Sequence, residues 1–171
     1  MGTYLATTCL AFAAIASRVA LAASHACSPD LQIRVVNSSA RASELAREVA
    51  NCTGGVFHAE WIGHVEFPET ISVLHGTVLE ITGAGPNAIA DGADSERFLN
   101  VINATLRVSG LRIQNCATVF SGGGVWAEAS VLSFNETTWS ENTASSHGGA
   151  VAVYNSGSVT WSGNTSWSHN T

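Results

Sequence analysis

Two oppositely charged residues have types and positions that could carry catalysis. Glu80 lies between Leu79 and Ile81, and Arg107 lies in the same way between two aliphatic residues further along the chain. Polysaccharide lyases use an arginine base beside carboxylates, and hydrolases use a pair of carboxylates. An exposed ion pair between adjacent strands, worth about 0–1 kcal/mol, explains both residues without catalysis. We favour the ion pair and assign no catalytic residue.

A second group of carboxylates, Asp91, Asp94 and Glu96, occupies one short loop. A calcium site needs several converging oxygen ligands, and this spacing matches only a fragment of a calcium-binding loop. We therefore expect a solvated turn. The histidines beyond the first residues share neither a register nor a ligand spacing, so no metal and no cofactor is expected. They are His58, His64, His75, His147 and His169.

The elements that position these side chains are set by an internal repeat. The run Gly148-Gly149-Ala150-Val151 repeats a glycine-rich run that begins at Gly122, and residues 167–170 repeat residues 139–142. Each copy follows its predecessor by about 26 to 28 residues, and a fixed period in this range indicates a repeat architecture.

Each repeat contains short runs in which apolar and polar residues alternate, as they do in strands. The best-defined track of apolar residues steps through Leu79, Leu106, Leu132 and Val159. A second track contains Leu99, Val125 and Val151, and a third contains Ile113, Trp139 and Trp167. Helical repeats would need 3.6-residue spacing over longer segments. We predict an all-β fold, a right-handed parallel β-helix with about 27 residues per coil and ~4.8 Å between coils.

Two short motifs carry a family resemblance over about residues 79–171. The first is Gly148, Gly149, Ala150 and Val151, and the second pairs Trp139 with Asn142 and Trp167 with Asn170. These runs resemble the repeats of the polymorphic outer membrane proteins of chlamydiae, which are right-handed β-helix surface proteins. Gly124 departs from the first motif, which has alanine there. The resemblance implies surface display or adhesion. It does not extend to the family's membrane anchor, because the chain has no sequence like the family's C-terminal barrel.

The N-terminal region divides into two segments. Residues 1–26 read as a signal peptide, with a short apolar run followed by small residues, although a Ser/Thr/Ala-rich organellar transit peptide is the competing interpretation. Residues 27–56 are expected to form a strand over Leu31–Val36, with Ile33 and Val35 on one face, and a helix over Ser39–Cys52 that caps the first coil. The β-helix then spans 57–171 and stops within a coil, which predicts a longer parent protein.

The charge and the glycosylation signals agree with an extracellular protein. The formal net charge is −6, and the chain contains no lysine, which argues against nucleic acid as a partner. No transmembrane span is expected in the mature segment. Five Asn-x-Ser/Thr sequons are candidate glycosylation sites. They are Asn37, Asn51, Asn103, Asn135 and Asn164.

The cysteines and the exposed tryptophans give weaker signals. A Cys27–Cys52 disulfide is one expectation and buried unpaired thiols are the other, whereas Cys116 is expected to face the core. Among the tryptophans of the repeats, Trp126 is the one expected to point outward, and a single exposed ring is weak evidence for a sugar-binding platform.

These observations favour a secreted or cell-surface β-helix protein, and the family resemblance implies a role in adhesion, recognition or structural display, without catalytic activity of its own. Its expected partner is a carbohydrate or another surface protein. The alternative is the N-terminal part of a polysaccharide-active enzyme, pectate lyase-like or a glycoside hydrolase, whose catalytic coils lie downstream.

Overall fold

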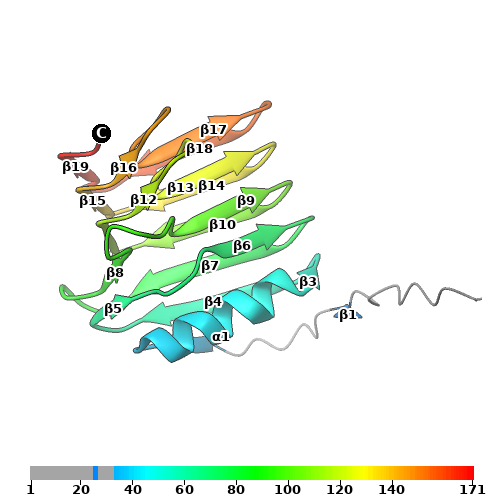
Figure 1. The fold of residues 1–171 in the computed structure, drawn as a ribbon. Helices are drawn as coiled ribbons and strands as arrows, with labels where there is room; N and C mark the ends of the chain where they lie inside the picture. Colours follow the sequence, from blue (N-terminus) through cyan, green and yellow to red (C-terminus); the bar gives the residue numbers. More distant parts are fainter. Residues whose placement is uncertain (1–24, 27–32) are drawn as a thin grey trace, which may run out of the picture.

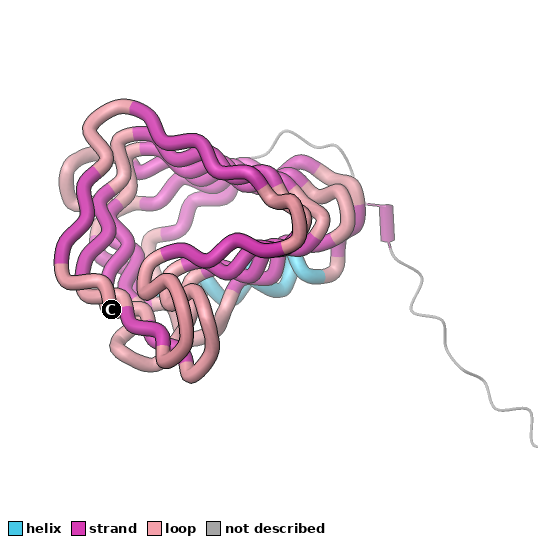
Figure 2. The backbone as a smooth tube through the Cα atoms, turned by 90° about the horizontal axis from the view of Figure 1, so that it is seen from above, coloured by secondary structure: helices cyan, strands magenta, loops and turns pink. Residues whose placement is uncertain are grey.

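The computed structural model describes residues 25–26 and 33–171. The rest of the predicted signal peptide and residues 27–32 lie outside this part of the chain. In the described part, the chain winds into an all-parallel β-solenoid of about five turns, with about 26 residues per turn. Successive strands lie side by side up the solenoid (Figure 1), and they superimpose around one interior when viewed along the axis (Figure 2).

Three parallel sheets form the walls, and we name them sheets I, II and III. Sheet I contains β2 (Ile33–Val36), β4 (Val56–Trp61), β7 (Val78–Gly83), β10 (Thr105–Ser109), β14 (Val131–Asn135) and β18 (Ser158–Ser162). Sheet II contains β5 (His64–Glu66), β8 (Ile89–Asp91), β11 (Arg112–Gln114), β15 (Thr138–Ser140) and β19 (Ser166–Ser168). Sheet III contains β6 (Ile71–Leu74), β9 (Leu99–Ile102), β13 (Val125–Glu128) and β17 (Val151–Tyr154).

The predicted registers of all three tracks are confirmed. In sheet I, Leu79 pairs with Leu106, Leu106 with Leu132, and Leu132 with Val159. The second and third predicted tracks lie in register in sheet III and sheet II, respectively. Because side chains alternate between the two faces of a strand, this register buries one apolar set in a single interior.

The upper part of the interior is aromatic. Trp139 is fully buried and its ring stacks on Trp167 with 5.5 Å between centroids, while Phe134 stacks on Trp161 at 4.5 Å. Trp161 and Trp167 belong to the last turn and are 39% and 47% exposed. The tryptophans that were predicted to point inward therefore form one stack, and only its outermost layer meets solvent.

An asparagine ladder closes the turn after sheet II. The side chain of Asn142 is fully buried, and its Oδ1 accepts a hydrogen bond from the backbone N–H of Cys116 at 3.1 Å. Its Nδ2 donates to the carbonyl oxygen of Ile113 at 3.1 Å and to Oδ1 of Asn170 at 2.8 Å. The repeated asparagine of the second motif thus satisfies backbone groups of neighbouring turns.

The glycine-rich motif forms a close backbone contact between turns. The N–H groups of Gly122, Gly123 and Gly124 donate to the carbonyl oxygens of the residues from His147 to Gly149. A Cβ atom at Gly123 would lie 2.2 Å from the carbonyl oxygen of Gly149, so this position requires glycine. Two short strands, β12 (Ala117–Thr118) and β16 (Thr143–Ala144), pair just before this contact.

The N-terminal cap is present but shorter than predicted. Helix α1 spans Ser39–Ala50 and packs most closely against β6, the first strand of sheet III, with Leu45 and Val49 buried (Figure 1). Cys52 was predicted to end the helix, but it lies in β3 (Cys52–Thr53), because the helix already ends at the cap residue Asn51. The helix thus covers the strand edge that β6 would otherwise expose.

The two N-terminal strands refine the other predictions for this region. Ile33 and Val35 of β2 share one face as predicted, and this face is the outer one, with exposed fractions of 63% and 42%. Strand β1 (His25–Ala26) pairs with β3, so the segment just before Cys27 lies beside Cys52. Cys52 is disulfide-bonded. Because Cys27 lies outside the described residues, its pairing with Cys52 stays a prediction.

Candidate functional site

The outer face of sheet III forms a groove, which we name the sheet III groove. It has a volume of about 600 Å³. Alternation along β13 buries Val125 and Ala127, and it therefore points Trp126 and Glu128 outward into the groove. The groove is lined by Arg97, Asn100, Ile102, Phe120, Ser121, Trp126, Glu128, Tyr154 and Asn155.

Two aromatic rings form the apolar wall of the groove. The rings of Trp126 and Tyr154 lie 6.1 Å apart between centroids, at 34° to each other. The hydroxyl group of Tyr154 donates a hydrogen bond to Oγ of Ser121 at 2.9 Å, which fixes the ring over the sheet. Ala152, which pairs with Trp126 on the same outer face, is only 8% exposed because its neighbours cover it.

Arg97 provides the positive charge at one end of the groove. Its Nε donates to the carbonyl oxygen of Gly122 at 2.9 Å, and its Nη2 donates to the carbonyl oxygen of Ser121 at 2.9 Å and to Oγ1 of Thr118 at 3.2 Å. Burial lowers the pKa of the Arg97 guanidinium group, which nevertheless stays protonated. The side chain is thereby held rigidly by the loop that precedes β13.

Two further polar groups complete the lining. Oδ1 of Asn100 is buried and has no hydrogen-bond partner, and it is the only such side-chain atom in the described part of the chain. Glu128 lies at the other end of the groove, where its Oε1 accepts a hydrogen bond from Nδ2 of Asn155. The groove therefore combines an aromatic wall, a positive end, a negative end and an unused hydrogen-bond acceptor.

Sequence reasoning identified Trp126 and missed its partner. Trp126 points outward as predicted, but it is not a single ring, because Tyr154 lies beside it. The repeat contained the signal: register places Tyr154 opposite Glu128, two residues beyond Trp126 on the adjacent strand. Diagonal neighbours across two strands lie close enough for large rings to touch.

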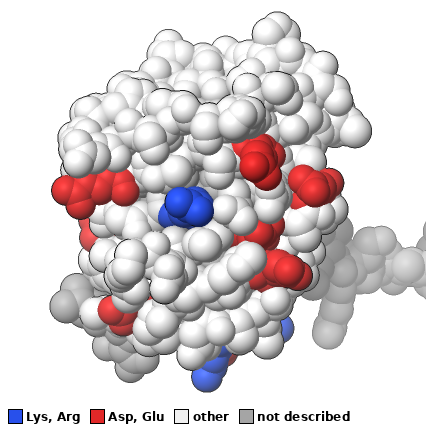
Figure 3. Space-filling view, turned by 90° about the vertical axis from the view of Figure 1, so that its left-hand side faces the viewer, with Lys and Arg blue, Asp and Glu red and all other residues white. Residues whose placement is uncertain are grey.

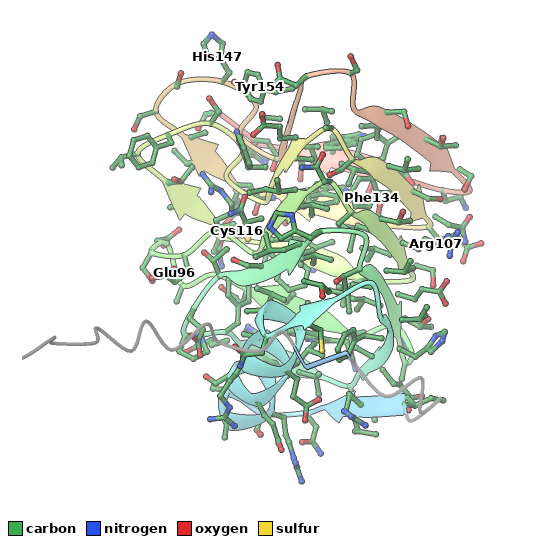
Figure 4. All side chains as sticks on the ribbon, turned by 90° about the vertical axis from the view of Figure 1, so that its right-hand side faces the viewer. Glu96, Arg107, Cys116, Phe134, His147 and Tyr154 are labelled. Carbon is green, nitrogen blue, oxygen red and sulfur yellow. The ribbon has the colours of Figure 1, made fainter. Side chains whose placement is uncertain are left out.

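The charged residues of sheet I behave as predicted. Arg107 forms an ion pair with Glu80 on the outer face, and Glu80 also contacts Nδ1 of His58 at 2.9 Å. Figure 4 shows Arg107 projecting from the surface, whereas Cys116 and Phe134 lie in the interior. Glu80 thus pairs with both Arg107 and His58. The predicted ion pair explains Glu80 and Arg107 without a catalytic role.

The loop carboxylates differ from their prediction. Asp91 was expected in a solvated turn, but it is only 5% exposed, because residues of neighbouring turns converge on it. Its carboxylate accepts hydrogen bonds from Nε2 of Gln114 at 2.8 Å, Nδ2 of Asn115 at 3.1 Å and the N–H of Ala93 at 2.9 Å. Nε2 of His64 lies 2.8 Å from the same carboxylate.

These contacts set the charge state of Asp91. Burial alone would raise its pKa, but the hydrogen bonds from Ala93, Gln114, Asn115 and His64 outweigh burial and lower the pKa below its ordinary value of 3.8. Asp91 is therefore an ionised structural carboxylate that joins three turns of sheet II. Within residues 25–26 and 33–171, no cluster of three or more His, Cys, Asp and Glu residues could hold a metal ion.

The other predicted sites are placed as follows. Asn37, Asn51, Asn103 and Asn164 are exposed, and Asn135 is half-buried with its Oδ1 bound to Ser162 Oγ at 3.0 Å. Their glycosylation stays a prediction. Cys116 is a free, fully buried thiol, as expected. No helix of the described residues has the length and apolar character needed to cross a membrane.

One side of the solenoid carries more acidic than basic side chains. Figure 3 looks onto the side of the solenoid that carries sheet II, where acidic side chains are scattered over a mainly uncharged surface with little basic area. This distribution follows the acidic composition of the chain.

Comparisons with known proteins identify no relative. No protein-family model matches the chain, and neither a curated protein nor a solved structure shows significant similarity to it.

Proposed function

We propose that this chain is a secreted or cell-surface recognition protein that binds a saccharide in the sheet III groove. The observation that carries the proposal is the pair of rings of Trp126 and Tyr154 beside polar groups of Arg97, Asn100 and Glu128. A sugar ring has apolar C–H faces that pack on aromatic rings and hydroxyl groups at its edge that need hydrogen-bond partners. The groove supplies both kinds of contact.

Secretion is supported by two independent features of the N-terminal region. Residues 1–26 have the composition of a signal peptide. Cys52 is disulfide-bonded, and disulfides persist mainly in oxidising compartments outside the cytosol.

The role in adhesion or display rests on the repeat motifs. The Gly-Gly-Ala-Val run and the Trp-x-x-Asn runs stack on their copies in adjacent turns, as repeats of the polymorphic outer membrane protein type would. We attribute such a repeat to this chain, and with it a role in presenting a binding surface. The acidic surface supports a partner other than nucleic acid.

Screening of the purified chain on an array of saccharides tests the proposal. We expect at least one saccharide to bind, and we expect Trp126→Ala and Tyr154→Ala each to weaken that binding by about tenfold, as the loss of a ring contact worth about 1.4 kcal/mol implies. Trp167→Ala is the matched control, because it removes an exposed ring outside the groove. Binding that survives both groove substitutions would contradict the site. Release of shortened polysaccharide by a longer protein that contains this chain and its downstream coils would favour the alternative enzyme.

A further inference from the structure

Arg97 differs from the other arginines of the described residues in how its charge is compensated. Arg34, Arg41 and Arg107 each pair with a glutamate, and Arg47 and Arg112 are exposed to water. Arg97 is half-buried, and its hydrogen bonds in the described part of the chain all go to uncharged acceptors.

The uncompensated charge faces the groove. A cation that is partly removed from water, without a counter-ion, is unfavourable unless an anion joins it. Nε and Nη2 of Arg97 are already used by Ser121, Gly122 and Thr118, which leaves Nη1 for a ligand. Glu128 does not form an ion pair with Arg97, and it lies on the far side of Trp126 along the strand direction.

Asn100 supplies the second unusual group. Its Oδ1 is shielded from solvent and accepts no hydrogen bond from the protein, although it lines the same groove as Arg97. A buried acceptor without a donor normally destabilises a fold by its full desolvation penalty. A hydroxyl group of a bound ligand would satisfy it.

We infer that the ligand of the groove is a saccharide that contains a hexuronate unit, whose carboxylate binds Arg97 and one of whose hydroxyl groups donates to Asn100. This inference rests on the proposed function and specifies its substrate class. The C–H face of the sugar ring packs against Trp126, and a hexuronate ring carries both a carboxylate and several hydroxyl groups. In this orientation the negative charge of the ligand lies beside Arg97, at the end of the groove opposite Glu128.

The binding test uses two ligands that differ only in charge. Calorimetric titration of the chain with a short oligosaccharide of glucuronic acid, and with the same oligosaccharide after its carboxyl groups have been reduced to alcohols, isolates the carboxylate. The charged form should bind about tenfold to hundredfold more tightly, the range expected for a hydrogen bond to a charged group. The preference should shrink in high salt, because the interaction is ionic.

Substitutions then assign the preference to residues. Arg97→Gln should remove the preference for the charged form, Arg97→Lys should keep part of it, and Arg112→Gln is the matched control because Arg112 is exposed in sheet II. Asn100→Ala should weaken both ligands equally while it leaves the stability of the chain unchanged or raises it. A stability gain together with a binding loss distinguishes a ligand-binding group from a structural one.

The outcomes separate the inference from the proposed function. Equal binding of both oligosaccharides overturns the inference and leaves saccharide binding in place. If neither oligosaccharide binds but other saccharides on the array do, the hexuronate inference is overturned and the proposed function stands. If no saccharide binds at all, both proposals fail. Because the ligand pair is compared on the native chain, the result stands even if an Arg97 variant does not fold.

Discussion

Gly124 lies directly against the indole ring of Trp139. A Cβ atom at residue 124 would lie 2.7 Å from Cζ3 of Trp139 and 2.7 Å from the carbonyl oxygen of Ala150, both shorter than a van der Waals contact. Residue 124 is the place where the chain has glycine and the motif has alanine. The large ring in the buried turn thus accounts for the missing methyl group.

The contact predicts a coupled pair of substitutions. Gly124→Ala should destabilise the chain by about 1–3 kcal/mol, the usual cost of overpacking a core. In the background of Trp139→Phe the same substitution should cost less, because the smaller ring frees space. Urea unfolding of the two single variants and the double variant gives the coupling free energy. Additive effects would show that the contact does not determine the residue.

The asparagine ladder predicts a large effect from a small deletion. Asn142→Ala should leave the N–H of Cys116 and the carbonyl oxygen of Ile113 without their bonds, and each buried unsatisfied group costs about 1–3 kcal/mol. Asn170→Ala, in the last turn, should cost less because that side chain is nearer to solvent. Denaturant unfolding of both variants measures the difference, and equal losses would contradict the ladder.

Asp91 predicts a pH dependence of stability. Its pKa is lowered in the folded state, so its contribution is fully present above about pH 4 and is lost as the pH falls through the lower folded-state pKa. Asp91→Asn should therefore destabilise the chain at neutral pH and flatten the loss of stability in acid. Urea unfolding at several acidic pH values tests this. Asp94→Asn, at an exposed position of the same loop, is the control. In this variant the free energy of unfolding should depend on pH as it does in the wild-type chain.

Cys116 predicts an unreactive thiol. Burial, with the nearby charge of Asp91, raises the pKa of Cys116 far above the usual range for a thiol, and the thiolate is the reactive form. Iodoacetamide should leave Cys116 unmodified in the folded chain and modify it after denaturation, as peptide mass spectrometry can show. Rapid modification under native conditions would contradict the burial of this side chain.

The capping helix predicts that one buried leucine supports the first turn. Leu45 is 1% exposed in α1, so Leu45→Ala should cost about 2–5 kcal/mol by leaving a cavity under β6. Arg47→Ala on the exposed side of the same helix is the control and should change stability little. Thermal unfolding followed by circular dichroism compares the two. If the two variants unfold alike, α1 does not stabilise the solenoid.

Much of the fold could be predicted from the sequence because strand alternation and repetition are local signals. Leu79, Leu106, Leu132 and Val159 stack because a period-two pattern, repeated at a nearly constant interval, permits only one register that buries them all. The helix that begins at Ser39 was predictable for a similar reason, since the spacing of its apolar residues is also a local signal.

The candidate site depended on the tertiary structure. The repeat register places Tyr154 on the strand next to Trp126, but only the tertiary structure shows that the two rings lie side by side and that the Tyr154 hydroxyl group bonds Ser121. Asp91 looked like a solvated loop residue because His64, Gln114 and Asn115, which bury it, come from other turns. Periodicity specifies which side of a strand a residue occupies, and only packing between turns decides which partners it meets there.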